Sequence, residues 1–358
     1  MQRRAMGAPV KVIAVVVVVA IVGAAAYYFL LANNSGPSTT SNSPVTLTVY
    51  GSVHTTDLQV VLKDFHGNYS WITVNYVELT PPAALTRLTS ELGGNKSTAD
   101  VVFETNSVVN VMKSKGFLTP YNSTQLPNYS SNFHDKSGYW ATAILLPVAF
   151  SYNTQALNPG TLPTLAGIVD PTWKGKVTIL DPSLGSTGTQ YLLSMVPALG
   201  NQTWTSWLQN LEKVDAPSPT SDTTALAQNV ASDQFEIGVF TYLHDVVRLA
   251  NGGAHIGWFL PKLANGSSLP LYTASTLVAI VKGTPHMQAA EDFENFILSK
   301  AAQETIGNSA VRVPAMPGLN TPYSLEAIAP GAKVIYFPTP QVSAQASKWG
   351  NIFKQWGY

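Results

Sequence analysis

The sequence predicts an exported α/β protein with a membrane helix at its N-terminus. From residue 45 onward, short β-branched runs alternate with amphipathic segments of helical period. Before them lies one uncharged apolar run, which three basic residues precede. The composition, with 45% hydrophobic and 10% aromatic residues in a chain of 358, excludes a disordered protein.

The apolar run near the N-terminus determines the expected compartment. Arg3, Arg4 and Lys11 precede the run Val12–Ala32, which has 21 residues and no charge. As a helix it would span about 31 Å, enough to cross the hydrocarbon core. The basic side stays in the cytoplasm, so the rest of the chain is expected outside. The alternative is a cleaved signal peptide, for which the small residues of Gly23–Ala26 offer a cleavage site and which would leave a secreted protein.

Residues 33–44 are expected to be a tether between this anchor (residues 1–32) and the folded part. They contain only Ser, Thr, Asn, Pro and Gly, as a solvated linker does. An exported glycoprotein is also indicated by the N-x-S/T acceptor pattern. The pattern occurs seven times, at Asn33, Asn68, Asn95, Asn122, Asn128, Asn201 and Asn265.

Charge and cysteine content exclude several classes of protein. The chain has 20 basic and 20 acidic residues and no Lys/Arg cluster, so a nucleic-acid partner is not expected. It has no cysteine, which excludes thiol catalysis, Cys-ligated zinc, Fe–S clusters and a lipidated bacterial lipoprotein. A weakly charged exterior without disulfides would suit an archaeal surface protein.

The first half of the folded part predicts alternating strands and helices. Val45–Tyr50 is a β-branched strand, and Thr55 or Thr56 caps a helix with Leu58, Val61, Leu62 and Phe65 on one face. A second strand at 72–76, a helix opening at Pro81-Pro82 and a third strand at 100–103 complete a βαβαβ order. This order predicts a parallel sheet with helical crossovers.

The second half continues the alternation. The expected strands are 143–152, which Pro147 interrupts, 177–180, 237–240 and 277–282. The expected helices are 190–196, 204–214, 223–231, 285–298 and 342–356.

Catalytic motifs are absent from the sequence. It has no HExxH, no G-x-S-x-G, no P-loop and no G-x-G-x-x-G after a strand. His–acid pairs such as His244 and Asp245 are sequence neighbours, which are not expected to face the same way. We therefore expect neither enzymatic activity nor a cofactor.

The loop 181–190, DPSLGSTGTQ, is a candidate ligand-binding segment. It joins a strand to a helix, and it offers Ser186, Thr187, Gly188 and Thr189 at the helix N-terminus. Such an end carries roughly half a positive charge and binds anions. The alternative interpretation is a plain capping loop.

Further candidates follow the ends of the predicted strands, where α/β sheets bind ligands. Ser52 and His54 follow the first strand, and Thr105 and Asn106 follow the third. Thr241 and Tyr242 follow the strand IGVF, and Ser275 precedes the strand LVAIVK.

Seven stretches in order resemble the extracellular solute-binding proteins of ABC transporters. They are LTVYGSVH, STADVVFETN, GFLTPY, FSYNT, DPTWKGKVTILDPSLGSTGTQYL, SDQFEIGVFTYLHD and TLVAIVKGTPHMQAAEDFENFILSKAAQE. The resemblance covers about residues 45–315 and is to the type II periplasmic-binding fold, in the subgroup of ferric-iron, thiamine and phosphonate receptors. It implies lobe 1 at 45–147 and 277–358, lobe 2 at 148–276, and strands crossing near Pro147–Tyr152 and Ser275–Val281.

The resemblance also implies the function and the partners. A small ligand or ion would bind between the lobes, and the closed protein, a monomer, would dock on an ABC permease. For ferric iron the metal ligands would be His54 and Tyr242, but the second tyrosine of the family's pair is Leu243 here, and Thr105 stands where a carboxylate would. An oxyanion-bearing solute suits the loop with Ser186. A thiamine-like ligand would use Tyr242, Trp258 and Asp245.

Two hypotheses that assign the chain to other classes of protein stay open. One is an anchored surface or adhesion protein, which the acceptor asparagines and the low charge permit. The other is an anchored α/β hydrolase, which would need a nucleophile, a base and an acid that no motif supplies.

Overall fold

The computed structural model describes residues 43–94, 97–184, 187–214, 220, 222–336 and 340–358. Residues 44–358 form one compact unit. The predicted anchor at Val12–Ala32 lies outside the described residues, and so does most of the tether. Within the described ranges no helix has the length and apolarity that crossing a bilayer requires. The five acceptor asparagines that lie in these ranges, Asn68, Asn122, Asn128, Asn201 and Asn265, are all exposed.

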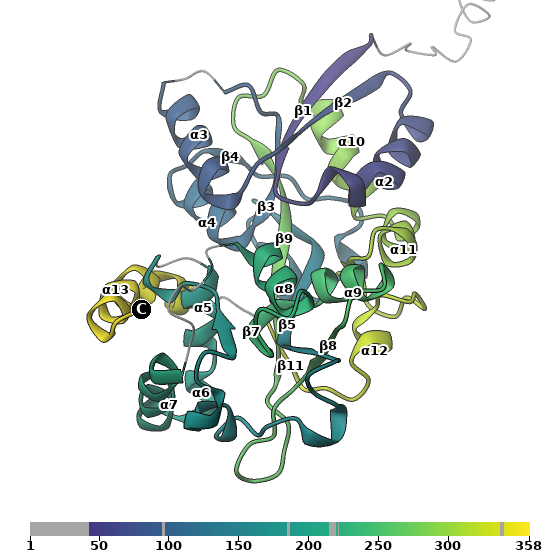
Figure 1. Cartoon of the computed structure of the whole chain (residues 1–358). Coiled ribbons are helices and arrows are strands. Elements are labelled where there is room, and N and C mark those ends of the chain that lie inside the picture. The colour runs from purple at the N-terminus through teal and green to yellow at the C-terminus, as the bar shows by residue number, and fades with distance from the viewer. Residues whose placement is uncertain (1–42, 95–96, 185–186, 215–219, 221, 337–339) are drawn as a thin grey trace, which may run out of the picture. The chain divides into compact units, whose positions relative to one another are not determined.

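A mixed sheet runs through the unit in the order β2-β1-β3-β9-β5-β7-β6 (Figure 1). Four short strands pair with its two long inner strands, β8 and β10 with β5, and β4 and β11 with β9. The strands are β1 Val45–Gly51, β2 Ile72–Glu78, β3 Val101–Thr105, β4 Leu118–Thr119, β5 Ala141–Asn153, β6 Val177–Ile179, β7 Ile237–Tyr242, β8 Ile256–Phe259, β9 Leu271–Val281, β10 Val313–Pro314 and β11 Val334–Tyr336.

The helices cover the faces of this sheet. They are α2 Thr55–Asn68, α3 Pro81–Gly93, α4 Asn106–Ser114, α5 Thr187–Ser194, α6 Val196–Leu199, α7 Asn201–Val214, α8 Thr223–Ala231, α9 Leu243–Asn251, α10 Met287–Ile297, α11 Lys300–Ser309, α12 Leu325–Ile328 and α13 Pro340–Trp356. Short 3₁₀ turns join several of them.

The predicted βαβαβ unit is confirmed. β1 pairs in parallel with both β2 and β3, so α2 and α3 are crossover helices. Leu58, Val61 and Phe65, the predicted inner face of α2, are at most 1% exposed. The carboxyl ends of β1, β2 and β3 therefore meet at one edge of the sheet.

Two long strands connect the halves of the unit. β9 pairs antiparallel with β3 at one end and with β5 along its other half, and β5 continues to pair with β7. Both strands are buried at every position, which explains their near-continuous apolar sequence. The crossings that the resemblance implied lie within these two strands. β5 also contains Pro147, and its pairing with β7 has a register shift between Ala149 and Ser151.

The C-terminal helix packs differently from the expected assignment to lobe 1. α13 contacts α5 and the turn Pro182–Leu184, both of which lie in the segment 148–276 that is expected to form lobe 2. Trp349 meets the fully buried Trp204 of α7 edge-on, with 4.7 Å between ring centroids. Burial of these aromatic surfaces holds the end of the chain on lobe 2.

Candidate functional site

A cleft of about 920 Å³ opens where the carboxyl ends of β1, β2, β3 and β7 meet. Residues from the first turns of α2, α3, α4, α5, α8 and α9, or just before them, line it. Each helix start places backbone N–H groups and a partial positive charge near the cleft. The polar lining residues are Ser52, His54, Glu78, Thr80, Thr105, Ser107, Asp181, Gln190, Asp222, Thr223, Thr224, Tyr242, His244, Thr276 and Arg312.

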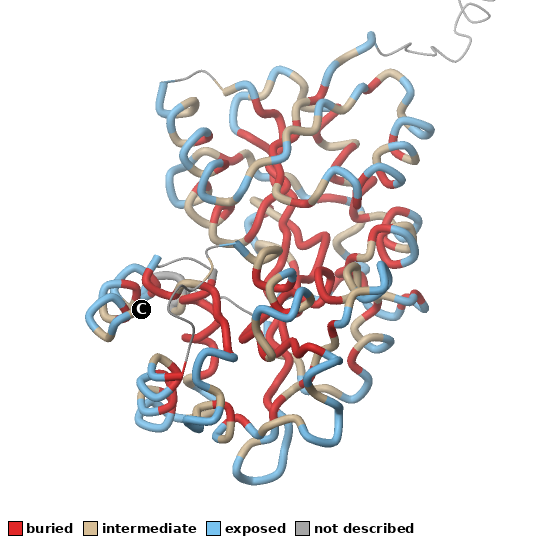
Figure 2. The backbone as a smooth tube through the Cα atoms, in the orientation of Figure 1, coloured by how far each residue is buried: buried red, intermediate tan, exposed pale blue. Residues whose placement is uncertain are grey.

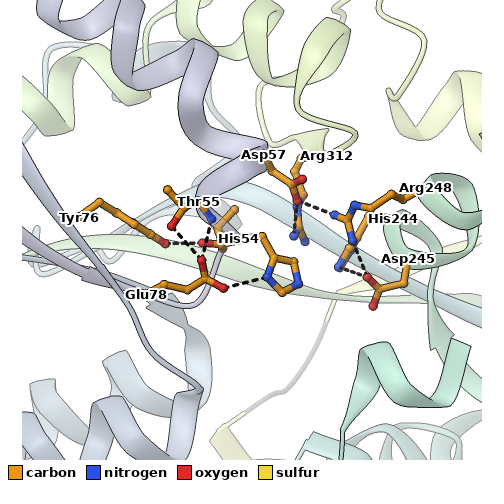
Figure 3. Close-up of polar contacts among 10 residues, drawn as sticks. His54, Thr55, Asp57, Tyr76, Glu78, His244, Asp245, Arg248 and Arg312 are labelled. Carbon is orange, nitrogen blue, oxygen red and sulfur yellow. Dashed lines mark hydrogen bonds and ion pairs between the residues drawn. The ribbon is translucent and has the colours of Figure 1, made fainter. Parts of the chain in front are cut away.

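On lobe 1, a carboxylate fixes the imidazole of His54. His54 is the N-cap residue of α2, and its Nδ1 lies 2.9 Å from Oε1 of Glu78 at the end of β2 (Figure 3). Oε2 of Glu78 accepts hydrogen bonds from the backbone N–H and the hydroxyl of Thr55, each 2.8 Å long. Both carboxylate oxygens are thus engaged, and Nε2 of His54 is the nitrogen that a solute would meet.

The environment of Glu78 keeps it ionised. Burial alone would raise the pKa of its carboxyl, but the hydrogen bonds from Thr55 and His54 outweigh that effect, and the pKa lies below its usual value. Glu78 therefore presents a negative charge to the imidazole at neutral pH.

On lobe 2, Tyr242 is the N-cap residue of α9 and is 8% exposed. Burial raises the pKa of its phenol to about 12, although a hydrogen bond with the buried Tyr191 works in the opposite direction. The ring stacks on His244, with 5.0 Å between ring centroids. The tyrosine is thus a neutral phenol at pH 7 unless a cation displaces its proton.

A largely buried ion cluster lies beside His54 (Figure 3). Oδ2 of Asp57 on α2 lies 2.9 Å from Nε and 2.6 Å from Nη2 of Arg312, and 2.5 Å from Nη2 of Arg248 on α9. Nη1 of Arg248 binds Oδ1 of Asp245 at 2.8 Å. Arg312 also lines the cleft, so Asp57 orients a guanidinium whose remaining donors are available to a solute.

Two strained backbone positions support the lining residues. Val311, just before Arg312, has φ 51°, and Phe240, two residues before Tyr242, has φ 57°. Side-chain-bearing residues rarely adopt this left-handed conformation, and Val311 is β-branched as well. Such strain persists where the surrounding fold imposes it, and it is common at functional sites.

Glu104 is a buried carboxyl next to the cleft. It lies between Phe103 and the lining residue Thr105 and is 0% exposed. Burial raises its pKa to about 8, against the hydrogen bonds from Ser52 and the Thr105 N–H. At neutral pH Glu104 is therefore mostly protonated, and Oε1 has no hydrogen-bond partner.

Metal ligands are few among the described residues. No three side chains of the His, Cys, Asp or Glu type converge there in a way that would hold a metal ion. A metal in this cleft would therefore need ligands of another kind, such as a tyrosine oxygen or atoms of a solute.

The family model for bacterial extracellular solute-binding proteins matches residues 96–336, about two thirds of the chain. This chain belongs to that family. It is a solute-binding protein, as the resemblance predicted, and the two-lobe cleft is the place where such a fold takes its solute.

Relatives support the same assignment. Over 261 residues the chain is 25% identical to "Iron uptake protein A1" of Synechocystis sp., which covers 69% of this chain and 70% of the relative. The fold is that of a ferric binding protein from Campylobacter jejuni, with a TM-score of 0.72, 19% identity and coverage of 87% and 99%. It is also that of AfuA from Actinobacillus pleuropneumoniae, solved with fructose-6-phosphate bound, with a TM-score of 0.72, 20% identity and coverage of 88% and 98%.

Five of the candidates named from sequence line the cleft of this solute-binding protein. They are Ser52, His54, Thr105, Gly188 and Tyr242. Strands that are distant in sequence bring them together, because β1, β3 and β7 all end at the cleft. Ser186 lies outside the described residues, and so does the side chain of Thr187.

Four candidates have structural partners instead. Thr189 is buried and donates to the carbonyl of Pro182, and Thr241 shares a 2.7 Å hydrogen bond with Ser151. Oδ1 of Asn106 accepts the backbone N–H of Ser275 at 3.0 Å, which ties the start of α4 to β9. None of these four is a lining residue. Gly188 lines the cleft, but a Cβ there would meet Cβ of Leu180 at 2.7 Å, so close packing also requires its glycine.

Sequence reasoning missed Glu78, His244 and Arg312. Glu78 could have been found, because it ends β2 just as the named candidates follow β1 and β3. His244 was noted only as a neighbour of Asp245. No sequence pattern pointed to Arg312, because this residue reaches the cleft only when the chain after α11 returns and pairs with β5 through β10.

Proposed function

We propose that this protein is an extracytoplasmic receptor that captures a small solute in the cleft and delivers it to an ABC permease. The observation that carries the proposal is that His54 of α2 and Tyr242 of α9 line one cleft from different lobes. A solute that contacts both would favour the closed arrangement of the lobes. We also propose that the binding domain faces outside and is monomeric, and that it is held by the helix predicted at Val12–Ala32 or secreted after cleavage of that segment.

We further propose that the solute is ferric iron bound to an oxyanion chelator. The hydrogen bond from Nδ1 of His54 to a carboxylate is the usual arrangement of a metal-binding histidine, because it orients the ring. The phenolate oxygen of Tyr242 suits a hard trivalent cation. These two donors leave most of the coordination sphere to the chelator. The name of the Synechocystis relative agrees with an iron cargo.

The chelator's negative charge has a counterpart in Arg312. Its guanidinium is 3% exposed, is oriented by Asp57 and lines the cleft. The helix starts around the cleft add partial positive charge. A carboxylate or phosphate that reaches Arg312 would form a charge-assisted hydrogen bond.

A metal-free phosphorylated solute is the second candidate. Arg312 and the helix starts would serve it equally well, and the AfuA structure contains a sugar phosphate. A thiamine-like ligand has less support, because Asp245 pairs with Arg248 and neither Asp245 nor Trp258 lines the cleft.

The test is titration of residues 44–358 with ferric citrate, citrate alone, fructose-6-phosphate, phosphate and thiamine. Ferric citrate should bind most tightly and give the visible absorption of a ferric–phenolate bond. Tight binding of fructose-6-phosphate, with no colour from iron, would favour the second candidate. If protein freed of co-purified solute binds nothing and does not contract in small-angle scattering, the receptor proposal fails and the adhesion alternative gains support.

A further inference from the structure

The two helices that carry the proposed solute contacts also carry an ion pair. His54 caps α2, and Asp57 lies in the first turn of that helix. Tyr242 caps α9, and Arg248 lies further along the same helix. Oδ2 of Asp57 and Nη2 of Arg248 are 2.5 Å apart (Figure 3).

This ion pair joins lobe 1 to lobe 2. Of the ion pairs between described residues, it is the one whose partners belong to different lobes. The others connect groups within one lobe, such as Arg87–Glu91, Lys113–Asp135 and Lys176–Glu236. The lobes would have to separate at this point for the cleft to widen between α2 and α9.

The partners of the pair differ in burial. Figure 2 shows the buried segments along the centre of the fold. The side chain of Asp57 is 7% exposed and also binds Arg312, whose side chain is 4% exposed. The side chain of Arg248 is 33% exposed, and its other nitrogen binds Asp245 on the same helix. Asp57 and Arg312 would therefore stay paired when the lobes open, whereas Arg248 would move away with α9.

We propose that Asp57 and Arg248 are positioning residues that form a latch between the lobes and raise the solute affinity by holding α2 and α9 together. The inference rests on the proposed receptor function. A latch that favours the closed arrangement before the solute arrives increases the binding-competent fraction, and the apparent affinity rises in proportion. The solute and the latch then act on the same two helices.

Arg248→Met tests the latch better than a change at Asp57. Removing the Asp57 carboxylate would leave Arg312 buried without its partner, so the variant could fail for a structural reason alone. Arg248→Met removes the partly exposed charge but also leaves the buried Asp245 without that partner. Arg248→Lys, which restores a positive charge to both carboxylates, is therefore the rescue variant. Arg87→Met is the matched control, because Arg87 forms its ion pair within α3.

The measurement is the distance between the lobes in ligand-free protein. The chain has no cysteine, so spin labels at Lys63→Cys on α2 and Gln209→Cys on α7, both exposed, attach only there. Double electron–electron resonance should show a shift to longer distances in Arg248→Met, an intermediate distribution in Arg248→Lys and the parent distribution in Arg87→Met. High salt should lengthen the distance in the parent and leave Arg248→Met unchanged, because a partly exposed pair is screened.

The dissociation constant for ferric citrate should rise about two- to five-fold in Arg248→Met, the range for a pair of this exposure. Parent-like distances in a folded Arg248→Met would overturn the latch, and so would a parent distance insensitive to salt. Because the distances are measured without any solute, failure of every solute to bind would count against the receptor proposal and leave the latch result intact.

Discussion

Several ionisable side chains at the cleft are buried, and burial makes their charged forms costly. Glu104 has no solvent exposure, and Tyr242 is 8% exposed, yet each carries a titratable group at the cleft or beside it. Desolvation keeps Glu104 mostly protonated near pH 7, because it raises the carboxyl pKa to about 8, and it makes the phenol of Tyr242 a weaker acid than an exposed tyrosine. Arg312, in contrast, stays charged because Asp57 forms an ion pair with it at 2.6 Å. The electrostatic character of the cleft thus depends on which buried group has a partner.

Glu104 should make the stability of the protein depend on pH. The folded carboxyl holds its proton up to about pH 8, whereas the unfolded one releases it near its usual pKa of 4.5. The folded state then binds more protons between these values, so the free energy of unfolding falls as pH rises through that range, by an amount on the order of a few kcal/mol. Glu104→Gln, which mimics the protonated acid, should match wild type near pH 5 and exceed it near pH 8 in urea melts. Equal pH slopes for the two proteins would contradict this assignment.

Tyr242→Phe should abolish the visible absorption of bound ferric iron and weaken binding at least tenfold, because a phenolate ligand is lost. The ring and its stacking on His244 remain, but the hydrogen bond with the buried Tyr191 is lost, so the free energy of unfolding should fall by about 1 to 3 kcal/mol without loss of the fold. Tyr152→Phe, outside the lining set, is the matched control and should keep both colour and affinity. Retained absorption in Tyr242→Phe would show that iron binds elsewhere.

At the scale of secondary-structure elements, the N-termini of several helices lie at the cleft. α2, α4 and α9 follow β1, β3 and β7 with at most a few residues between, so each strand end becomes a helix N-terminus at the cleft. None of these three has a side-chain cap. α8 differs, because Oδ1 of Asp222 accepts the Ala225 N–H at 2.8 Å. Helix α8, which contains the lining residues Thr223 and Thr224, is thus capped by Asp222, which also lines the cleft.

Asp222→Ala should lower the free energy of unfolding by about 1 kcal/mol, the usual cost of an N-cap. Asp222→Asn or Asp222→Ser keeps an acceptor and should recover most of that loss in chemical denaturation. A loss of the same size in all three variants would mean that the charge of Asp222, and not its capping bond, stabilises α8.

At the scale of the whole molecule, β5 and β9 connect the two lobes, and the cleft lies between the lobes. Buried along their full length, these strands provide a rigid axis, and changes in lobe position would occur around it. The ion pair between α2 and α9 adjoins Arg312, which lines the cleft.

Solute binding should therefore contract the molecule. In small-angle scattering of residues 44–358, saturating ferric citrate is expected to reduce the radius of gyration, and citrate alone should have a smaller effect. The variant His54→Ala, which removes the lobe 1 contact, should contract less at equal occupancy. An unchanged radius in protein that binds the solute would exclude closure as the signal to a permease.

The sequence alone predicted the family and the order of most of the longer elements. β-branched runs and amphipathic periods predicted β1, β2 and β3 with α2 and α3, because burial of one face leaves a periodic pattern in a local stretch of chain. The same reasoning named His54 and Tyr242, since the end of a parallel strand is defined by its own residues. α4 and α9, which begin directly at the ends of β3 and β7, were not predicted, and neither was the docking of α13 on lobe 2.

Only the tertiary structure decided which polar residues are available to a solute. Thr189 and Thr241 look like Ser52 in sequence, yet their hydroxyls bond to Pro182 and Ser151 inside the protein. Asp57 and Arg312 are 255 residues apart in the chain and meet only because α2 and the segment before β10 pack together. Hydrogen bonds and ion pairs between distant segments leave no local pattern, so pairing, burial and charge at the cleft had to come from the fold.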